Sequence, residues 1–286
     1  MASSATAIDR TGSLPSIEGS LNYLGAMDER PVTYAYPPPP GTPENNLRSE
    51  AHRMPISDGR PIANKLSLDE QGFELLRHET AVKDFYDPEQ VRSVYYPEVI
   101  ELLKQATGAE KVVIFDHTLR RAGSSKQQIE GVKEPVQSAH NDYTLTSGPQ
   151  RVQELLPADE AAERLTHRYT EVNVWRPISG PVMEWPLAVC DARTMTQKDF
   201  VATYRLYPDR TGEIYTITYS PNHRWYYFPQ MERNEVVLLK GYDSLSDGRA
   251  RFTGHTSFAD PTTPPGAPPR ESIEVRALLF FAPEKH

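Results

Sequence analysis

The chain has 286 residues and a mass of 32.3 kDa, and its content of 38% hydrophobic and 24% charged residues is that of a folded globular protein. Its formal charge of -8 and its isoelectric point near 5.6 argue against a nucleic-acid partner and against binding to an anionic membrane. A chain of this length exceeds the usual single domain, but β-rich barrels often reach it as one unit.

The single cysteine, Cys190, excludes an intrachain disulfide and predicts a reducing, cytoplasmic location for the protein. We expect Cys190 to be a small buried side chain in a strand. No stretch approaches the roughly 18 apolar residues of a membrane span, and residues 1–16 lack the apolar region of a signal peptide.

The prolines predict how the chain is divided. Of 26 prolines, several cluster in residues 37–43 and 261–269, and such stretches cannot occupy central strands because proline has no N–H to donate. There is no internal repeat and no second compositional regime. We therefore expect an extended N-terminal arm over residues 1–60 and one domain over residues 61–286.

Two helices are predicted in the first 165 residues. Asp87 followed by Pro88 is a helix start, apolar residues then recur at helical spacing, and the pattern ends at Gly108. A second helix is expected over residues 149–164.

Beyond residue 168 the pattern changes to the period-two alternation of strands. The predicted strands are separated by turn residues and cover residues 112–115, 169–175, 200–207, 213–219, 225–228, 235–242 and 272–281. The fold class is therefore mainly β with flanking helices. We expect a double-stranded β-helix, or jelly roll, with the N-terminal helices packed on one sheet.

His140-Asn141-Asp142 is the first candidate for a functional site along the chain. Residues i and i+2 of a strand point to the same side, so this imidazole and this carboxylate could share a metal ion. His255 lies on a later strand and could complete a set of two histidines and one carboxylate. Such a set leaves open positions on iron(II) for a chelating cosubstrate and O2.

Arg270 and Ser272 alternate onto one face of the last predicted strand, after His255 and a proline-rich loop. A guanidinium together with a hydroxyl suits a grip on the distal carboxylate of a cosubstrate. The order of these features along the chain is the order that a 2-oxoglutarate oxygenase needs.

Residues 117–281 resemble the fungal and bacterial hydroxylase/desaturase family, which includes gibberellin desaturase-like and cephamycin 7α-methoxylase small-subunit-like enzymes as well as meroterpenoid endoperoxidases. Four stretches carry the resemblance: NHRWYYFPQM from Asn222, EVVLLKGYDS from Glu235, HTSF from His255 and RESIEVR from Arg270. The resemblance implies an oxidoreductase, a dioxygenase that uses iron(II), 2-oxoglutarate and O2 in the biosynthesis of secondary metabolites. Hydroxylation, desaturation and endoperoxide formation all occur in the family.

Several residues have competing interpretations. His223 could replace His255 as the third ligand, and His117 could face the pocket or be structural. Arg276 could bind the cosubstrate in place of Arg270, or pair with Glu274 on the outside of the sheet. Trp225 could line the cosubstrate or substrate pocket, although an aromatic residue in a strand is more often core.

Two alternative functions remain open at this point: a metal-free jelly-roll binding or scaffold protein, and a cupin-type iron dioxygenase that does not use 2-oxoglutarate. For the oxygenase we expect a small-molecule substrate, a polycyclic or terpenoid-like intermediate held by aromatic walls, and no nucleic-acid or membrane partner; a homodimer is left open. The segments around residues 37–42 and 120–134 are the candidates for a lid.

Overall fold

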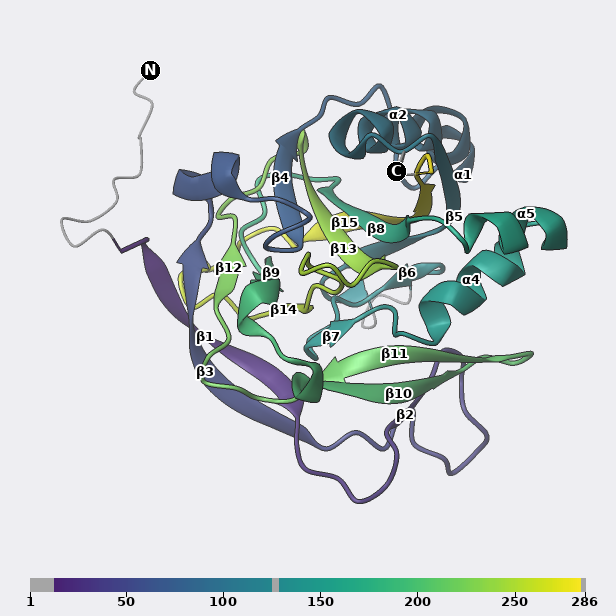
Figure 1. Ribbon diagram of the computed structural model, residues 1–286. Helices are drawn as coiled ribbons and strands as arrows, with labels where there is room; N and C mark the ends of the chain where they lie inside the picture. Colours follow the sequence, from purple (N-terminus) through teal and green to yellow (C-terminus); the bar gives the residue numbers. More distant parts are fainter. Residues whose placement is uncertain (1–12, 125–128, 284–286) are drawn as a thin grey trace.

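The computed structural model describes residues 13–124 and 129–283, and in this part of the chain two β-sheets face each other (Figure 1). The larger sheet has nine strands. In spatial order they are β1 (Ser16–Leu24), β3 (Ser49–Asp58), β12 (Trp225–Tyr227), β9 (Leu187–Cys190), β14 (His255–Ser257), β7 (His140–Asn141), β11 (Thr211–Ile217), β10 (Phe200–Leu206) and β2 (Val32–Tyr34).

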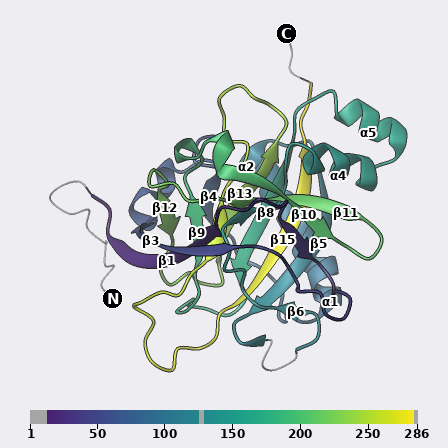
Figure 2. The ribbon, with the colours of Figure 1, turned by 90° about the horizontal axis from the view of Figure 1, so that it is seen from below.

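The smaller sheet has six strands, and Figure 2 shows it behind β10 and β11 of the larger one. Its order is β4 (Phe73–Arg77), β13 (Glu235–Asp243), β8 (Tyr169–Pro177), β15 (Glu271–Phe280), β5 (Lys111–Arg121) and β6 (Val132–Lys133). Neighbouring strands are often far apart in sequence, as in a jelly roll. The predicted fold class is confirmed.

The described part of residues 1–60 does not hang free of the sheets. Strand β1 pairs with β3 along its whole length, β3 also pairs with β12, and β2 pairs with β10. The segment that we expected to be an arm therefore contributes three strands to the larger sheet, because its apolar residues, such as Leu21 and Ile56, alternate onto the buried face. A domain boundary at residue 60 stays a prediction.

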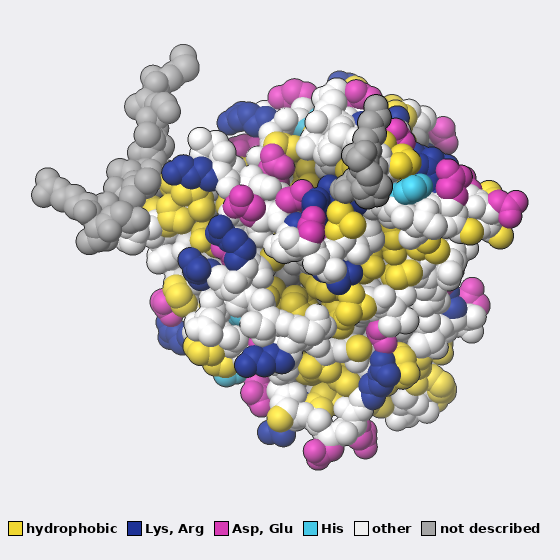
Figure 3. All heavy atoms as spheres, in the orientation of Figure 1, with side chains coloured by type: hydrophobic (Ala, Val, Ile, Leu, Met, Phe, Trp, Pro, Cys, Tyr) yellow, Lys and Arg dark blue, Asp and Glu magenta, His cyan; other side chains and the backbone are white. Residues whose placement is uncertain are grey.

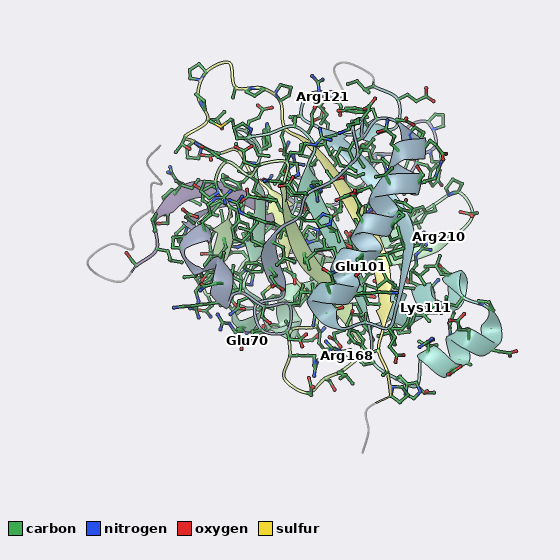
Figure 4. All side chains as sticks on the ribbon, turned by 90° about the horizontal axis from the view of Figure 1, so that it is seen from above. Glu70, Glu101, Lys111, Arg121, Arg168 and Arg210 are labelled. Atoms are coloured by element: carbon green, nitrogen blue, oxygen red, sulfur yellow. The ribbon has the colours of Figure 1, made fainter. Side chains whose placement is uncertain are left out.

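The first predicted helix is confirmed as α1 (Pro88–Gln90), a π-helical turn (Val91–Tyr95) and α2 (Tyr96–Thr107) in one continuous run. The Asp87 carboxylate accepts a hydrogen bond from the Glu89 N–H, and Gly108 ends α2 with a φ of +75°. Figure 4 shows α2, marked by Glu101, lying across the smaller sheet. Its buried Val99 and Leu103 pack against the outer face of that sheet.

The second predicted helix is divided into α4 (Ser147–Leu155) and α5 (Ala158–Arg164). Pro157 causes the break, because a residue before proline is driven out of the helical region, and Leu156 is extended with φ -110° and ψ 154°. Short 3-10 turns cover Arg60–Lys65, Ala192–Thr194 and Gln197–Asp199.

The two faces of the smaller sheet differ in polarity, and this difference positions the site. Val172 and Val174 of β8 face the helices, whereas Asn173 on the same strand is fully buried on the side toward the larger sheet. Glu274 and Arg276 of β15 are hydrogen-bonded with one another on that inner side. The space between the sheets therefore holds polar groups as well as two separate apolar clusters, one around Trp175 and one around Tyr242. No described helix is long and apolar enough to cross a membrane.

Candidate metal and cosubstrate site

His140 and His255 lie on neighbouring antiparallel strands, directly opposite each other in the pairing of β7 with β14. Their ring centroids are 4.3 Å apart. Asp142 follows β7, and its Oδ1 lies 3.4 Å from Nε2 of His140. One ligand atom from each of the three residues lies within 4.8 Å of the others, so the structure brings together the three residues that the sequence proposed as a metal site.

Hydrogen bonds fix which nitrogen of each imidazole can bind a metal. Nδ1 of His140 lies 2.8 Å from the carbonyl oxygen of Ser138, and Nδ1 of His255 lies 3.0 Å from that of Thr253. A carbonyl only accepts, so each Nδ1 carries the proton and each Nε2 keeps its lone pair. Burial lowers the pKa of His255, which favours the neutral imidazole that a metal requires.

The two oxygens of Asp142 have different surroundings. Oδ2 accepts hydrogen bonds from Nε of Arg276 and Nδ2 of Asn173, both at 2.8 Å, which leaves Oδ1 on the side of His140. Burial alone would raise the pKa of Asp142, but Arg276 and the two histidines outweigh it and hold the pKa well below its ordinary value. The carboxylate is therefore ionised and oriented.

Asn141, between the two ligands, is a structural anchor that the sequence did not reveal. Its side chain is fully buried and points away from its neighbours. Nδ2 donates to the carbonyls of Tyr143 and Gly241 at 2.7 and 2.8 Å, and Oδ1 accepts from the N–H of Thr253 at 3.0 Å. Because the Thr253 carbonyl in turn holds the ring of His255, Asn141 connects the two ligand-bearing segments.

We expect Asn141→Ala to lower both the stability of the fold and the affinity for metal. Three hydrogen bonds disappear and their partners stay buried, which costs about 2–4 kcal/mol of the free energy of unfolding. Metal affinity should fall about 10–100-fold, as for other residues that orient ligands. Urea unfolding and titration with Mn²⁺ measure the two effects. The exposed Asn222→Ala is the control, and unchanged metal affinity in Asn141→Ala would contradict the anchoring role.

A narrow cavity of about 20 Å³ extends from the two histidines to Arg270, between Trp175, Leu187 and Glu274. The Arg270 side chain is 3% exposed, and burial, followed by the nearby Arg120, lowers its pKa to about 9. It is therefore a cation at neutral pH. Nη1 donates to the carbonyl of Trp185 at 2.6 Å, but Nε has no hydrogen-bond partner among the described residues, and no described carboxylate forms an ion pair with it. A buried cation with free hydrogen-bond donors favours the binding of an anion.

A second cavity of about 280 Å³ opens on the other side of the triad. It lies between β10 and β11 of the larger sheet, β5 and β6 of the smaller sheet and helix α4, and it reaches His140 and Asp142. The two cavities share His140 and Arg120. The triad thus stands where a polar, narrow space meets a wider one that is open to small molecules.

Comparisons with known proteins agree with this geometry. A family model described as "Oxidoreductase/YMDC permease-like domain" matches residues 21–280. The chain is 32% identical over 260 residues to the Fe(II)/2-oxoglutarate-dependent dioxygenase nvfI of Aspergillus novofumigatus, covering 86% of this chain and 90% of that protein. It is 30% identical to the hydroxylase/desaturase efuI of Hormonema carpetanum, covering 93% and 96% of the two chains.

A solved structure of the iron and alpha-ketoglutarate-dependent endoperoxidase NvfI superposes with a TM-score of 0.84 at 29% identity, over 93% of this chain and 98% of that one. The chain belongs to the hydroxylase/desaturase family of iron(II)/2-oxoglutarate oxygenases.

For Arg276 of this oxygenase the sequence left two positions open, at the cosubstrate or paired with Glu274 outside the sheet. It lies between the sheets rather than outside them. Its donors reach Asp142, Glu274 at 2.6 Å, and both Asp116 and Thr118 at 3.1 Å. These partners occupy its guanidinium, so the structure offers no support for Arg276 as a cosubstrate ligand. It is a positioning residue for the carboxylate of Asp142.

Arg276 is not one of the proposed metal ligands, but we expect Arg276→Met to weaken metal binding through Asp142. The substitution leaves Asp142 and Glu274 buried without their cation, which costs about 3–5 kcal/mol of folding stability and raises the pKa of Asp142. We expect the dissociation constant for Mn²⁺ to rise about 10–100-fold, and more steeply as the pH falls. A metal affinity equal to that of Arg53→Met, an exposed control, would contradict this role.

Trp225 does not line either cavity, so its predicted cofactor role has to be corrected. It is 1% exposed in a core cluster with Tyr227 and Cys190, and its Nε1–H donates to the Tyr23 hydroxyl at 2.7 Å. The tryptophan at the site is Trp175 of β8, whose ring lies 5.5 Å from the Arg270 guanidinium. Trp175 and Tyr226 lie in the apolar cluster between the two sheets, whereas Trp225, next to Tyr226 on β12, points to the opposite face of the larger sheet.

The remaining candidate residues, Ser272, His223 and His117, lie outside both the triad and the narrow cavity. Ser272 is buried on β15 but does not line the cavity at Arg270; Ser257, two residues after His255, does. His223 stacks on Tyr23 and lies 3.5 Å from Asp199, outside the triad. His117 is hydrogen-bonded to the Tyr96 hydroxyl at 2.7 Å and is structural.

The expected lid segment, residues 120–134, lies only partly in the described chain. Arg120 and Lys133 pair at the ends of β5 and β6, whereas residues 125–128 lie outside the described residues. Residues 37–42 form a turn between β2 and β3 and do not line the wider cavity.

Proposed function

We propose that His140, Asp142 and His255 bind iron(II) and that Arg270 binds the distal carboxylate of 2-oxoglutarate, so that the enzyme oxidises a small natural-product intermediate. The observation that supports this most strongly is the position of the triad between a cavity that ends at a buried, unpaired Arg270 and a wider cavity. The activity is that of a dioxygenase, as in the relatives of the family.

The donor set fits iron(II). Two neutral imidazoles with free Nε2 atoms and one ionised carboxylate are the ligands of the two-histidine, one-carboxylate face, which leaves further coordination positions for a cosubstrate and O2. When bound, iron(II) and 2-oxoglutarate together activate O2 to remove hydrogen from a C–H bond of the substrate.

The residues around the narrow cavity contribute binding, orientation and exclusion of water. Arg270 supplies the charge for the distal carboxylate, while Trp175 and Leu187 form apolar walls that strengthen this attraction by lowering the local dielectric constant. The cavity is smaller than the cosubstrate, so side chains around it have to shift when 2-oxoglutarate enters.

The substrate is a small molecule, and hydroxylation, desaturation and endoperoxide formation are the reactions that we propose for it. A polycyclic or terpenoid-like substrate stays a prediction. Trp225 and Tyr227, on which it was based, pack in the core cluster with Cys190, and the aromatic residues that line the wider cavity are Tyr143 and Tyr207. The cytoplasmic location and the homodimer also stay predictions.

On the face of the molecule shown in Figure 3, basic and acidic side chains are interspersed and do not gather by sign.

Succinate release tests the proposed function. Purified enzyme with iron(II), ascorbate, 2-oxoglutarate and extracts containing pathway intermediates should release succinate and yield a product that has gained oxygen or lost two hydrogens. Omitting iron(II) or 2-oxoglutarate should stop both. Product formation that needs iron(II) but proceeds without succinate would indicate the cupin-type dioxygenase, and no turnover with any intermediate would favour the scaffold protein.

A further inference from the structure

The wider cavity is lined by more cations than its own carboxylates can neutralise. Its acids are already engaged: Glu154 with Arg151 at 2.7 Å, Glu213 with Arg30 at 2.5 Å, and Asp116 with Arg276 at 3.1 Å. The remaining acid, Asp142, belongs to the proposed metal site.

Lys133 and Arg205 have no such partners. Both line the cavity, and in the described part of the chain neither forms an ion pair or a side-chain hydrogen bond; Arg205 lies only near the ring of Tyr207, at 6.0 Å. They approach from opposite sheets, Lys133 from β6 and Arg205 from β10. Arg120, the neighbour of Lys133 in the strand pairing, donates to the carbonyl of Glu134 and also forms no ion pair with a described residue.

These cations are close enough to repel one another. The Lys133 side chain keeps contact with solvent; its partial burial lowers its pKa, and Arg120 and Arg205 lower it further. Converging cations destabilise a cavity unless an anion enters it, and unpaired donors on two walls can hold the two oxygens of one carboxylate.

We propose that the substrate carries a carboxylate, which Lys133 and Arg205 bind together at the wall of the wider cavity, with Arg120 adding positive charge. The inference rests on the proposed function, because it takes this cavity to be the substrate site. Holding the carboxylate there would place another part of the same molecule beside His140 and Asp142, which line the same cavity. Lys133 and Arg205 are then residues that determine specificity.

Matched acid and amide probes test the inference without turnover. The probes are 1-adamantanecarboxylic acid, camphanic acid and abietic acid, each beside its neutral primary amide. Binding is measured by saturation-transfer NMR on enzyme with 2-oxoglutarate and Mn²⁺ in place of iron(II). Broadening of the probe signals by Mn²⁺ shows that a probe binds near the metal site.

We expect at least one acid to bind about tenfold or more tightly than its amide, since an ionised carboxylate forms the stronger, charge-assisted hydrogen bonds, and to be broadened by Mn²⁺. Lys133→Met and Arg205→Met should each reduce this preference, and the double variant should abolish it, with amide binding and 2-oxoglutarate affinity unchanged. Neither side chain has an ion-pair partner among the described residues, so the melting temperature should stay the same. Arg53→Met and Lys198→Met remove exposed charges outside the cavity and should change nothing.

Equal binding of acid and amide, no bound acid at all, or a preference that survives the double variant would overturn the inference. So would a loss of 2-oxoglutarate affinity in the variants, because Lys133 and Arg205 would then serve the cosubstrate. Failure of wild-type enzyme to bind Mn²⁺ and 2-oxoglutarate would instead contradict the proposed function. The acid–amide comparison, repeated without metal, then still decides whether the cavity selects carboxylates.

Discussion

Replacing His140, Asp142 or His255 by alanine is expected to abolish iron(II) binding and turnover. Each substitution removes one of three ligand groups, and the remaining two cannot hold the metal at working concentrations. In the two histidine variants the fold should persist, because the hydrogen bonds of both rings are to carbonyls of their own segments, at Ser138 and Thr253. Asp142→Ala also leaves Arg276 without this partner and should lower the stability of the fold as well. Calorimetric titration with Mn²⁺ and circular dichroism measure the two outcomes.

His223→Ala provides the matched control for this prediction. His223 is a buried histidine at a similar depth, but it lies against Tyr23 and Asp199 rather than in the triad. Its substitution should reduce stability somewhat and leave metal affinity intact. Normal turnover in His255→Ala together with loss of metal in His223→Ala would show that the assignment of the third ligand is wrong.

Arg270→Leu is expected to raise the KM for 2-oxoglutarate strongly while leaving metal affinity unchanged. Losing a charge-assisted contact to a carboxylate that stays buried costs about 2–5 kcal/mol, which corresponds to roughly 30-fold or more in affinity. Anaerobic titration of the iron(II) enzyme with 2-oxoglutarate, followed by the absorption band of the chelate, measures this directly. An unchanged affinity would move the role to Arg120, the other cation that lines this cavity.

The stability of Arg270→Leu separates a binding role from a structural one. In the described chain Arg270 has no ion pair and its Nε has no hydrogen-bond partner, so replacing it by a shorter, apolar side chain removes a buried, uncompensated charge. The free energy of unfolding should stay equal or rise. A large loss of stability would indicate that the contact with the Trp185 carbonyl is structural.

Patterns along the sequence predicted the fold class, which the structure confirms, and the three residues of the proposed metal site, which the structure places together. Period-two alternation identified β8, β10, β13 and β15 within a few residues, because the buried sides of these strands require apolar residues at every second position. The spacing of His140 and Asp142 was sufficient to place two ligands together, since neighbours at i and i+2 are brought together by local geometry alone. His255 followed from its place on a later strand.

Only the tertiary structure decided which polar and aromatic residues meet the site. Arg276 and Arg270 share a strand side, yet one orients Asp142 and the other ends the narrow cavity, because different strands of the facing elements lie opposite each of them. Trp175 reaches Arg270, whereas Trp225 lies on the face of the larger sheet that points away from Trp175. The positive charge of the wider cavity comes in part from Lys133 of β6 and Arg205 of β10, and these two strands belong to different sheets. Alternation along one strand tells which side a residue faces, but the side chain it meets there is set by the packing of the two sheets.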